Sequence, residues 1–246
     1  MKKMMKAMAM AAVIMVAAAG SALATPSTQI WIPSTDIQAF KTVHLGIDSY
    51  IRVANDPNYG NNKAPNIYDL GLTFGVLPFE LIQLEVGVDY VVNGTSYDNT
   101  PVYFNWKLGT PEDGLFKYMP AVAIGMFNMG TNNLTNQNIL YGLVAKTLPV
   151  IGRLSVGGYT GSEHVLGKNQ STGMLASWDR SMTEISDKLW MAVDYMSGNN
   201  FNGALSFGAS WAFTKNVSLL VGFDIWNEAK SGGKNTFTTQ LDINLP

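Results

Sequence analysis

The sequence predicts an all-β fold, a transmembrane antiparallel up-and-down β-barrel of about 12 strands. Segments of about ten residues alternate between bulky apolar side chains and small or polar ones, which is the side-chain period of a strand. Charged residues make up only 14% of the chain, against about 25% in an ordinary globular domain. The N-terminus has the layout of a secretory signal peptide. These three features indicate an exported chain whose strands face lipid on one side.

Residues 1–24 are predicted to be that signal peptide, cleaved after Ala24. Three lysines near the start are followed by an apolar run and by small residues at 22–24. The alternative is a membrane anchor that stays attached, but the apolar run is short for a spanning helix. Cleavage is therefore the favoured interpretation.

The composition of the remaining chain excludes several classes of function. Without the three lysines of the signal peptide, 13 basic and 18 acidic residues remain, so no basic face is expected to bind nucleic acid. The absence of cysteine excludes disulfides and a thiolate nucleophile. No later apolar stretch has the length of a spanning helix, so the chain must cross a membrane with strands.

Residues 25–41, "TPSTQIWIPSTDIQAFK", precede the first strand and show no long alternation. We interpret them as an N-terminal periplasmic segment or as a short plug folded into the lumen. A tail lying against the barrel mouth is the favoured alternative. Residues 42–246 are assigned to the barrel.

Eleven strands are evident from alternation, and strand parity requires one more. Bacterial single-chain barrels have an even number of strands, with short periplasmic turns. The turns at 77–80, 148–152 and 214–216 can share the periplasmic side only if another strand lies between 161 and 186, and "TGMLASW" at 172–178 supplies it. The evident strands are at 42–53, 67–76, 81–91, 102–108, 121–129, 139–147, 153–160 and 187–196, in the hairpin 207–227, and at 237–245.

This register places the Asn- and Gly-rich segments in outer loops, where both residues tolerate turn conformations. The loops are expected at about 54–65, 93–100, 130–138, 162–170, 197–202 and 228–235.

Aromatic residues on the bulky face fall near the two ends of the strands. Two such belts around an aliphatic band are typical of the edges of a bilayer. A soluble β-sandwich or lipocalin-like barrel would instead leave Gly and Ser as most of the solvent face. The periplasmic belt is predicted to contain Trp106, Trp178, Trp211 and Phe213, and the outer belt Tyr68, Tyr90, Tyr141 and Tyr195.

With this pattern, residues 42–246 resemble Gram-negative outer-membrane β-barrel proteins of the porin-like kind. The resemblance implies the outer membrane as location and its lipid as partner. In addition, "MPAVAIGMFNMGTNN" followed by "YGLVAKTL" is similar to a hairpin of outer-membrane barrels linked to exopolysaccharide export. The chain departs from common porins in ending "INLP" rather than in an aromatic residue.

Charged residues on the small or polar face are candidates for the lumen lining. They either pair across the interior or face water, because an unpaired buried charge is costly. A barrel of 12 strands is intermediate between small barrels, whose interior is filled by side chains, and large barrels, which enclose an aqueous channel. Because the small inward residues leave space unfilled, a narrow aqueous lumen is expected. The lumen candidates are Asp48, Arg52, Asp69, Glu85, Asp89, Lys107, Lys146, Arg153, Lys188, Asp194 and Asp224.

No catalytic residue, metal site or cofactor is predicted. His44 lies near Asp48, but no Gly-x-Ser-x-Gly motif is present. Outer-membrane phospholipases resemble the chain in strand number and carry a His-x-Ser pair, whereas Leu45 and Gly46 follow His44 here. His164 and Glu163 are too few ligands for a metal.

Three functions remain open at this level. The first is a small channel for passive diffusion of small hydrophilic solutes. The second is a non-conducting accessory barrel in envelope assembly or polysaccharide export, and the third is an outer-membrane lipid-modifying enzyme. The sequence names neither a solute nor a protein partner.

Overall fold

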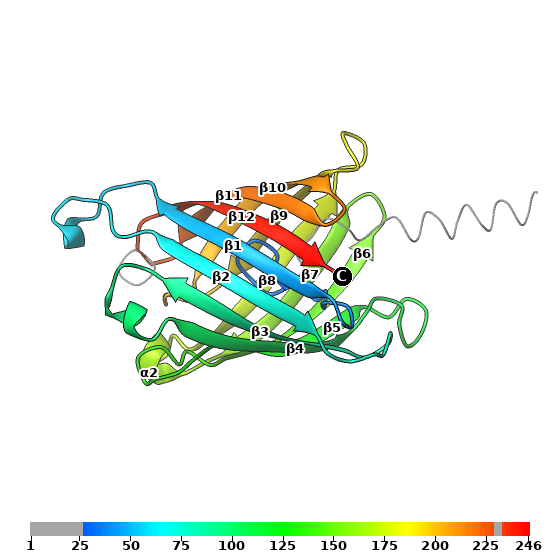
Figure 1. Cartoon of the computed structure of the whole chain (residues 1–246), viewed down its shortest axis with the longest axis horizontal. Helices are drawn as coiled ribbons and strands as arrows, with labels where there is room; N and C mark the ends of the chain where they lie inside the picture. Colours follow the sequence, from blue (N-terminus) through cyan, green and yellow to red (C-terminus); the bar gives the residue numbers. More distant parts are fainter. Residues whose placement is uncertain (1–26, 229–232) are drawn as a thin grey trace, which may run out of the picture.

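The computed structural model describes residues 27–228 and 233–246, and its core is a closed barrel of 12 antiparallel strands (Figure 1). Each strand pairs with its neighbours in sequence, and β1 closes the barrel against β12. The predicted fold and strand number are confirmed. The strands are β1 (Val43–Arg52), β2 (Ile67–Gly75), β3 (Gln83–Val92), β4 (Val102–Thr110), β5 (Ala121–Gly130), β6 (Ile139–Leu148), β7 (Gly152–Thr160), β8 (Thr172–Ser181), β9 (Leu189–Met196), β10 (Ala204–Thr214), β11 (Val217–Trp226) and β12 (Thr236–Leu245).

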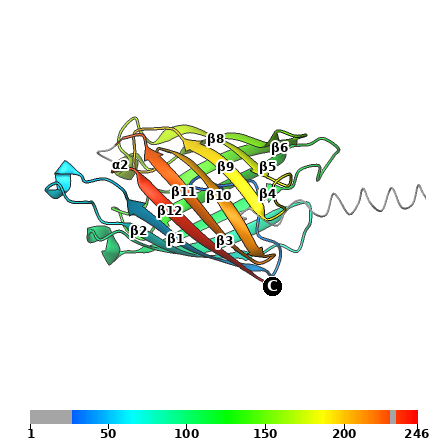
Figure 2. The same cartoon turned by 90° about the horizontal axis from the view of Figure 1, so that it is seen from above.

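The loops after the odd-numbered strands lie at one end of the barrel and the connections after the even-numbered strands at the other (Figures 1 and 2). In the described part of the chain, three short helices lie in the loops after β1, β3 and β7: η1 (Pro57–Tyr59), η2 (Ser96–Asn99) and α2 (Glu163–Leu166). Among the described residues no helix is both long and apolar enough to cross a membrane. The predicted signal peptide lies outside the described residues.

β8 is the strand that parity alone required. It pairs with β7 along Thr160↔Thr172 to Arg153↔Asp179, and with β9 on its other side. Its inward side chains, Leu175 among them, are buried, while Met174 is exposed on the outer surface. The prediction of a twelfth strand in this region is therefore confirmed.

Alternation explains how the wall separates its two faces. In β2, Leu70 and Phe74 are exposed on the outer surface, whereas Thr73 between them is buried on the inner side. Cross-strand register keeps this segregation from strand to strand, for example in Asp48↔Asp69. A slip by one residue would turn polar side chains toward lipid, so the pattern fixes the register.

A β-bulge in β5 turns two consecutive side chains toward the interior. Between the pairs Trp106↔Met126 and Phe104↔Met129, two residues of β5 lie opposite one residue of β4. The second of the two, Asn128, has a φ of 53°, which asparagine adopts more readily than most residues. The bulge therefore lets Phe127 pack in the core while Asn128 lines a cavity.

The N-terminal segment lies inside the barrel, visible as the blue loop in Figure 1. Residues 27–41 are called the plug from here on. Thr28 bridges Pro33, and the N–H of Gln29 donates to the carbonyl of Ile32 at 2.8 Å, so the plug begins with a tight turn. The favoured interpretation of this segment as a tail at the mouth is wrong. Its apolar side chains are buried instead against inward residues of the barrel wall.

An apolar core fills one side of the barrel interior. Ile32 of the plug packs there with buried residues of β6, β8 and β9, including Leu143, Leu175 and Met196. Ile30 packs separately against Trp190 and Leu220. Burial of these side chains on both sides of the contact stabilises the plug inside the barrel.

Candidate functional site

The plug is anchored to the barrel wall through the carboxylate of Asp194. Its Oδ2 accepts the backbone N–H of Ile30 at 2.7 Å, of Trp31 at 2.8 Å and of Ile32 at 3.4 Å. Asp194 is fully buried on the inner face of β9. Three consecutive N–H groups around one oxygen form a charge-assisted anion site, which compensates the buried charge.

Two ion pairs hold the rest of the plug. Lys107 lies 3.0 Å from Glu85 and also donates to the carbonyl of Ser27 at 3.1 Å, and both charged side chains are buried. The other oxygen of Glu85 accepts the N–H of Gln38 at 2.7 Å. Plug and wall are therefore joined by charged hydrogen bonds, which are stronger than neutral ones.

Arg153 makes the second ion pair. Its guanidinium lies 2.7 Å from Asp36 of the plug and 2.8 Å from Asp179 on the neighbouring strand β8. The other oxygen of Asp179 accepts the indole N–H of Trp190 at 3.1 Å. Asp179 thus links the plug contact to the packing of the lumen wall.

Trp31 lies between two cavities of the lumen. Its ring packs edge-on against Tyr50 at 5.2 Å and Trp226 at 4.9 Å between ring centroids, and its Nε1 donates to the carbonyl of Asn202 at 2.8 Å. Trp31, Tyr50, Asp69 and Asn128 contribute to the lining of both cavities. This aromatic cluster therefore lies where the two cavities adjoin.

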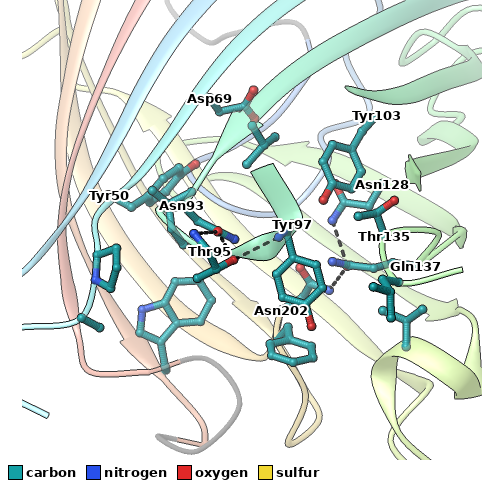
Figure 3. Close-up of a pocket in the computed structure, with 18 of the residues that line it drawn as sticks. Tyr50, Asp69, Asn93, Thr95, Tyr97, Tyr103, Asn128, Thr135, Gln137 and Asn202 are labelled. Atoms are coloured by element: carbon teal, nitrogen blue, oxygen red, sulfur yellow. Dashed lines mark hydrogen bonds between the residues drawn. The ribbon is translucent and has the colours of Figure 1, made fainter. Parts of the chain in front are cut away.

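The outer cavity, of about 250 Å³, lies at the end of the barrel that carries the loops after the odd-numbered strands, and Figure 3 shows its lining. Its lining combines aromatic rings, among them Tyr97 and Tyr103, with the side-chain amides of Asn128, Gln137 and Asn202. The loops after β1, β3, β5, β7 and β9 all contribute residues.

The inner cavity, of about 160 Å³, is acidic. Asp48, Asp69 and Asp89 line it from three adjacent strands, and none of the three forms an ion pair within the described part of the chain. Asp89 accepts a hydrogen bond from Asn105 at 2.8 Å. Three carboxyl groups that make no ion pair among the described residues therefore lie together on one side of this cavity.

Most predicted lumen residues face the interior, but two lysines do not. Lys146 is on the outer face of β6 near the end of the strand, where it pairs with Glu112 at 2.8 Å and Asp113 at 3.3 Å in the connection after β4. Lys188 is exposed in the turn before β9. The inward-facing members are Asp48, Arg52, Asp69, Glu85, Asp89, Lys107, Arg153, Asp194 and Asp224.

Sequence reasoning missed three carboxylates of the interior. Asp179 follows the last residue of the predicted twelfth strand, and extending that strand by one position would have found it. Asp242 lies on the face of β12 opposite its apolar residues and is buried. Asp36 belongs to the plug, and no pattern in the sequence places it next to Arg153.

The aromatic belts differ from the prediction at two positions. Tyr141 is 5% exposed and belongs to the inner apolar core, where its ring meets Phe127. β6 is apolar on both faces, so its alternation could not assign the inner one. Trp106 faces outward but is the central residue of β4 rather than near an end. The other predicted belt residues, Tyr68, Tyr90, Trp178, Tyr195, Trp211 and Phe213, are on the outer face.

His44 is engaged on both sides of its ring. Nδ1 lies 3.2 Å from Oδ1 of Asn244, and Nε2 lies 3.5 Å from Asp242. The hydroxyl of Ser218 donates to Asp242 at 3.3 Å rather than to the imidazole. A catalytic serine would instead have its hydroxyl hydrogen-bonded to the imidazole that acts as its base. The described residues also contain no group of three or more potential metal ligands.

The fold and its lumen define the class: a closed antiparallel β-barrel whose interior holds an N-terminal plug. No family model and no curated protein sequence matches the chain. A solved structure described as KdgM porin is similar over 83% of this chain and 98% of its own, with a TM-score of 0.52 and 8% identity. This likeness supports the fold.

Two further solved structures have lower TM-scores. An outer-membrane channel from Pseudomonas putida F1 covers 85% of this chain and 96% of its own, with a TM-score of 0.49 and 13% identity. Outer membrane phospholipase A from Escherichia coli covers 85% and 94%, with a TM-score of 0.46 and 12% identity.

Proposed function

We propose that the chain is an outer-membrane channel for passive diffusion of small hydrophilic solutes, constricted by its own N-terminal plug. The observation that carries this proposal is the pair of polar cavities on either side of Trp31. They belong to one lumen and share four lining residues, so a single aromatic cluster separates them. A barrel of 12 strands is wide enough for such a path only where small side chains leave space.

The proposed channel prefers cations. The unpaired carboxylates of Asp48, Asp69 and Asp89 line the inner cavity, whereas Lys107 and Arg153 are each bound to carboxylates. A confined lumen with low-dielectric walls raises the local concentration of ions of opposite charge. Small cations and uncharged solutes are therefore the proposed substrates.

The alternative is a non-conducting accessory barrel in envelope assembly or polysaccharide export. The anchoring of the plug favours it, because the contacts of Asp194, Glu85 and Arg153 all act to keep the lumen closed. In that case the plug never leaves, and the outer surface or the loops carry the function.

Single-channel recording in planar bilayers separates the two functions. Trp31→Ala removes the ring between the cavities, so we expect conductance steps larger than those of the wild-type protein. Trp178→Ala is the matched control, because this indole faces outward and donates to the carbonyl of Ile151. Absence of steps in both the wild type and Trp31→Ala would exclude the channel and leave the accessory barrel.

A further inference from the structure

Three side-chain amides form a cluster on the wall of the outer cavity. Oε1 of Gln137 accepts hydrogen bonds from Nδ2 of Asn128 at 3.0 Å and from Nδ2 of Asn202 at 2.6 Å. Figure 3 shows these two bonds meeting at Gln137. The three residues come from β5 and from the loops after β5 and β9, so separate parts of the chain converge on this point.

This arrangement leaves donors and acceptors available to a ligand. Within the described residues, Nε2 of Gln137 and the Oδ1 atoms of Asn128 and Asn202 have no hydrogen-bonding partner. An amide nitrogen donates two hydrogen bonds and an amide oxygen accepts two. The cluster therefore offers a fixed donor flanked by two acceptors, which matches neighbouring hydroxyl groups that donate and accept at once.

Aromatic rings supply the other component of the cavity. Tyr97 and Tyr103 line it from η2 and β4, and Trp31 and Trp226, whose rings pack edge-on, also line it. Aromatic faces pack against the C–H face of a saturated ring and also exclude water from it. An apolar lining with a few convergent polar groups is the usual composition of a small-molecule site.

Charge and size restrict the ligand further. Arg52 and Asp69 both line the cavity, so it carries one charge of each sign. Nη1 of Arg52 donates to the carbonyl of Lys234 at 2.6 Å, and the guanidinium lies 5.7 Å from the centroid of the Trp226 ring. The volume of about 250 Å³ is below the range of sites for drug-sized ligands. An uncharged ligand of one or two rings fits this description.

We propose that the outer cavity binds an uncharged sugar of one or two rings, held by the amide cluster of Asn128, Gln137 and Asn202 and by the ring of Tyr97. This inference rests on the proposed channel function, because it assigns a class of substrate to the outer cavity of that channel. Its test measures binding rather than conductance, so the two proposals can fail separately.

The test is isothermal titration calorimetry of the full chain in a detergent without a sugar head group. The probes are glucose, N-acetylglucosamine, maltose and glucuronate. We expect saturable binding of at least one uncharged sugar, weakened tenfold or more by Gln137→Glu. A glutamate still accepts from Asn128 and Asn202, but it cannot donate to the ligand.

Two further variants locate the site. Tyr97→Leu, which removes the ring, is expected to weaken binding at least tenfold. Asn133→Ala, an exposed amide of the same loop as Gln137, is expected to leave it unchanged. Binding that survives both Gln137→Glu and Tyr97→Leu would overturn the location. Binding of glucuronate alone would overturn the ligand class. The same conclusion would follow if no probe bound at millimolar concentrations.

Discussion

The carboxylate of Asp194 accepts the backbone N–H of Trp31 at 2.8 Å, which ties the residue between the two lumen cavities to strand β9. The same oxygen accepts the N–H groups of Ile30 and Ile32, so one side chain fixes the turn of the plug. The position of Trp31 between the two cavities thus depends on a charge held by the barrel wall.

Asp194→Asn should loosen this turn without changing its shape. A hydrogen bond to a charged group contributes about 1.5–3 kcal/mol and one between neutral groups about 0.5–1.5 kcal/mol, so the plug should lose roughly 1 kcal/mol or more of local stability. Hydrogen exchange of the peptide covering 27–41, followed by mass spectrometry, should then be faster. Asp187→Asn, in the exposed turn before β9, is the matched control. Equal exchange in both variants would contradict the anchoring role.

The fold was predictable from the sequence because lipid acts on every strand in the same way. One face must be apolar, so alternation reveals strand after strand, and the even strand number then identifies β8. Loops and turns follow from strand parity. The described loops agree closely with the predicted ones, for example residues 54–65 between β1 and β2.

The interior was less predictable because the plug makes part of it apolar. Ile139, Tyr141 and Leu143 face inward and are buried against the core around Ile32, so β6 is apolar on both sides and its alternation gives no direction. The contact between Asp36 and Arg153 joins residues 117 positions apart and leaves no periodic signal. Residues 27–41 show no alternation because they form the plug and not a strand of the wall.

Glycine at position 75 is required by the path of the plug. A Cβ at this position would lie 1.8 Å from the carbonyl oxygen of Ala39, so Gly75→Ala must displace the plug or the end of β2. We expect a loss of about 1–3 kcal/mol in the free energy of unfolding, as for other overpacked sites. Urea unfolding of the protein in lipid vesicles measures it.

Gly142→Ala is the control for this substitution. The position belongs to the outer face of β6, and an added Cβ would meet no atom within 4 Å. Its effect should stay within about 0.5 kcal/mol, as at other uncrowded surface positions. If Gly75→Ala and Gly142→Ala are equally stable, the close approach of the plug to β2 is wrong.

The acidic inner cavity predicts the ion preference of the channel. Replacing Asp48, Asp69 and Asp89 together by asparagine removes the unpaired charges but keeps the side-chain shapes. We expect the cation-to-anion permeability ratio to fall several-fold, because the potential of the lumen no longer attracts cations. The reversal potential across a salt gradient measures this ratio.

Glu80→Gln is the matched control for the triple variant. This residue is exposed in the turn between β2 and β3, where its charge is screened by salt. It should leave the reversal potential unchanged. An unchanged reversal potential in the triple variant as well would remove the electrostatic argument for cation preference, even if the channel conducts.

Two tryptophans distinguish the lipid face from the lumen. Trp211 is 43% exposed on the outer face of β10, whereas Trp190 is 3% exposed inside the barrel and bound to Asp179. In vesicles whose lipids carry bromine near the head group, bromine should quench the fluorescence of Trp211, because aromatic belts lie at that depth. Trp211→Phe should therefore lower the fraction of the tryptophan fluorescence that is quenched. Trp190→Phe should remove an unquenched part. Equal quenching losses in the two variants would place both rings in the same environment, which the alternation of a membrane barrel does not allow.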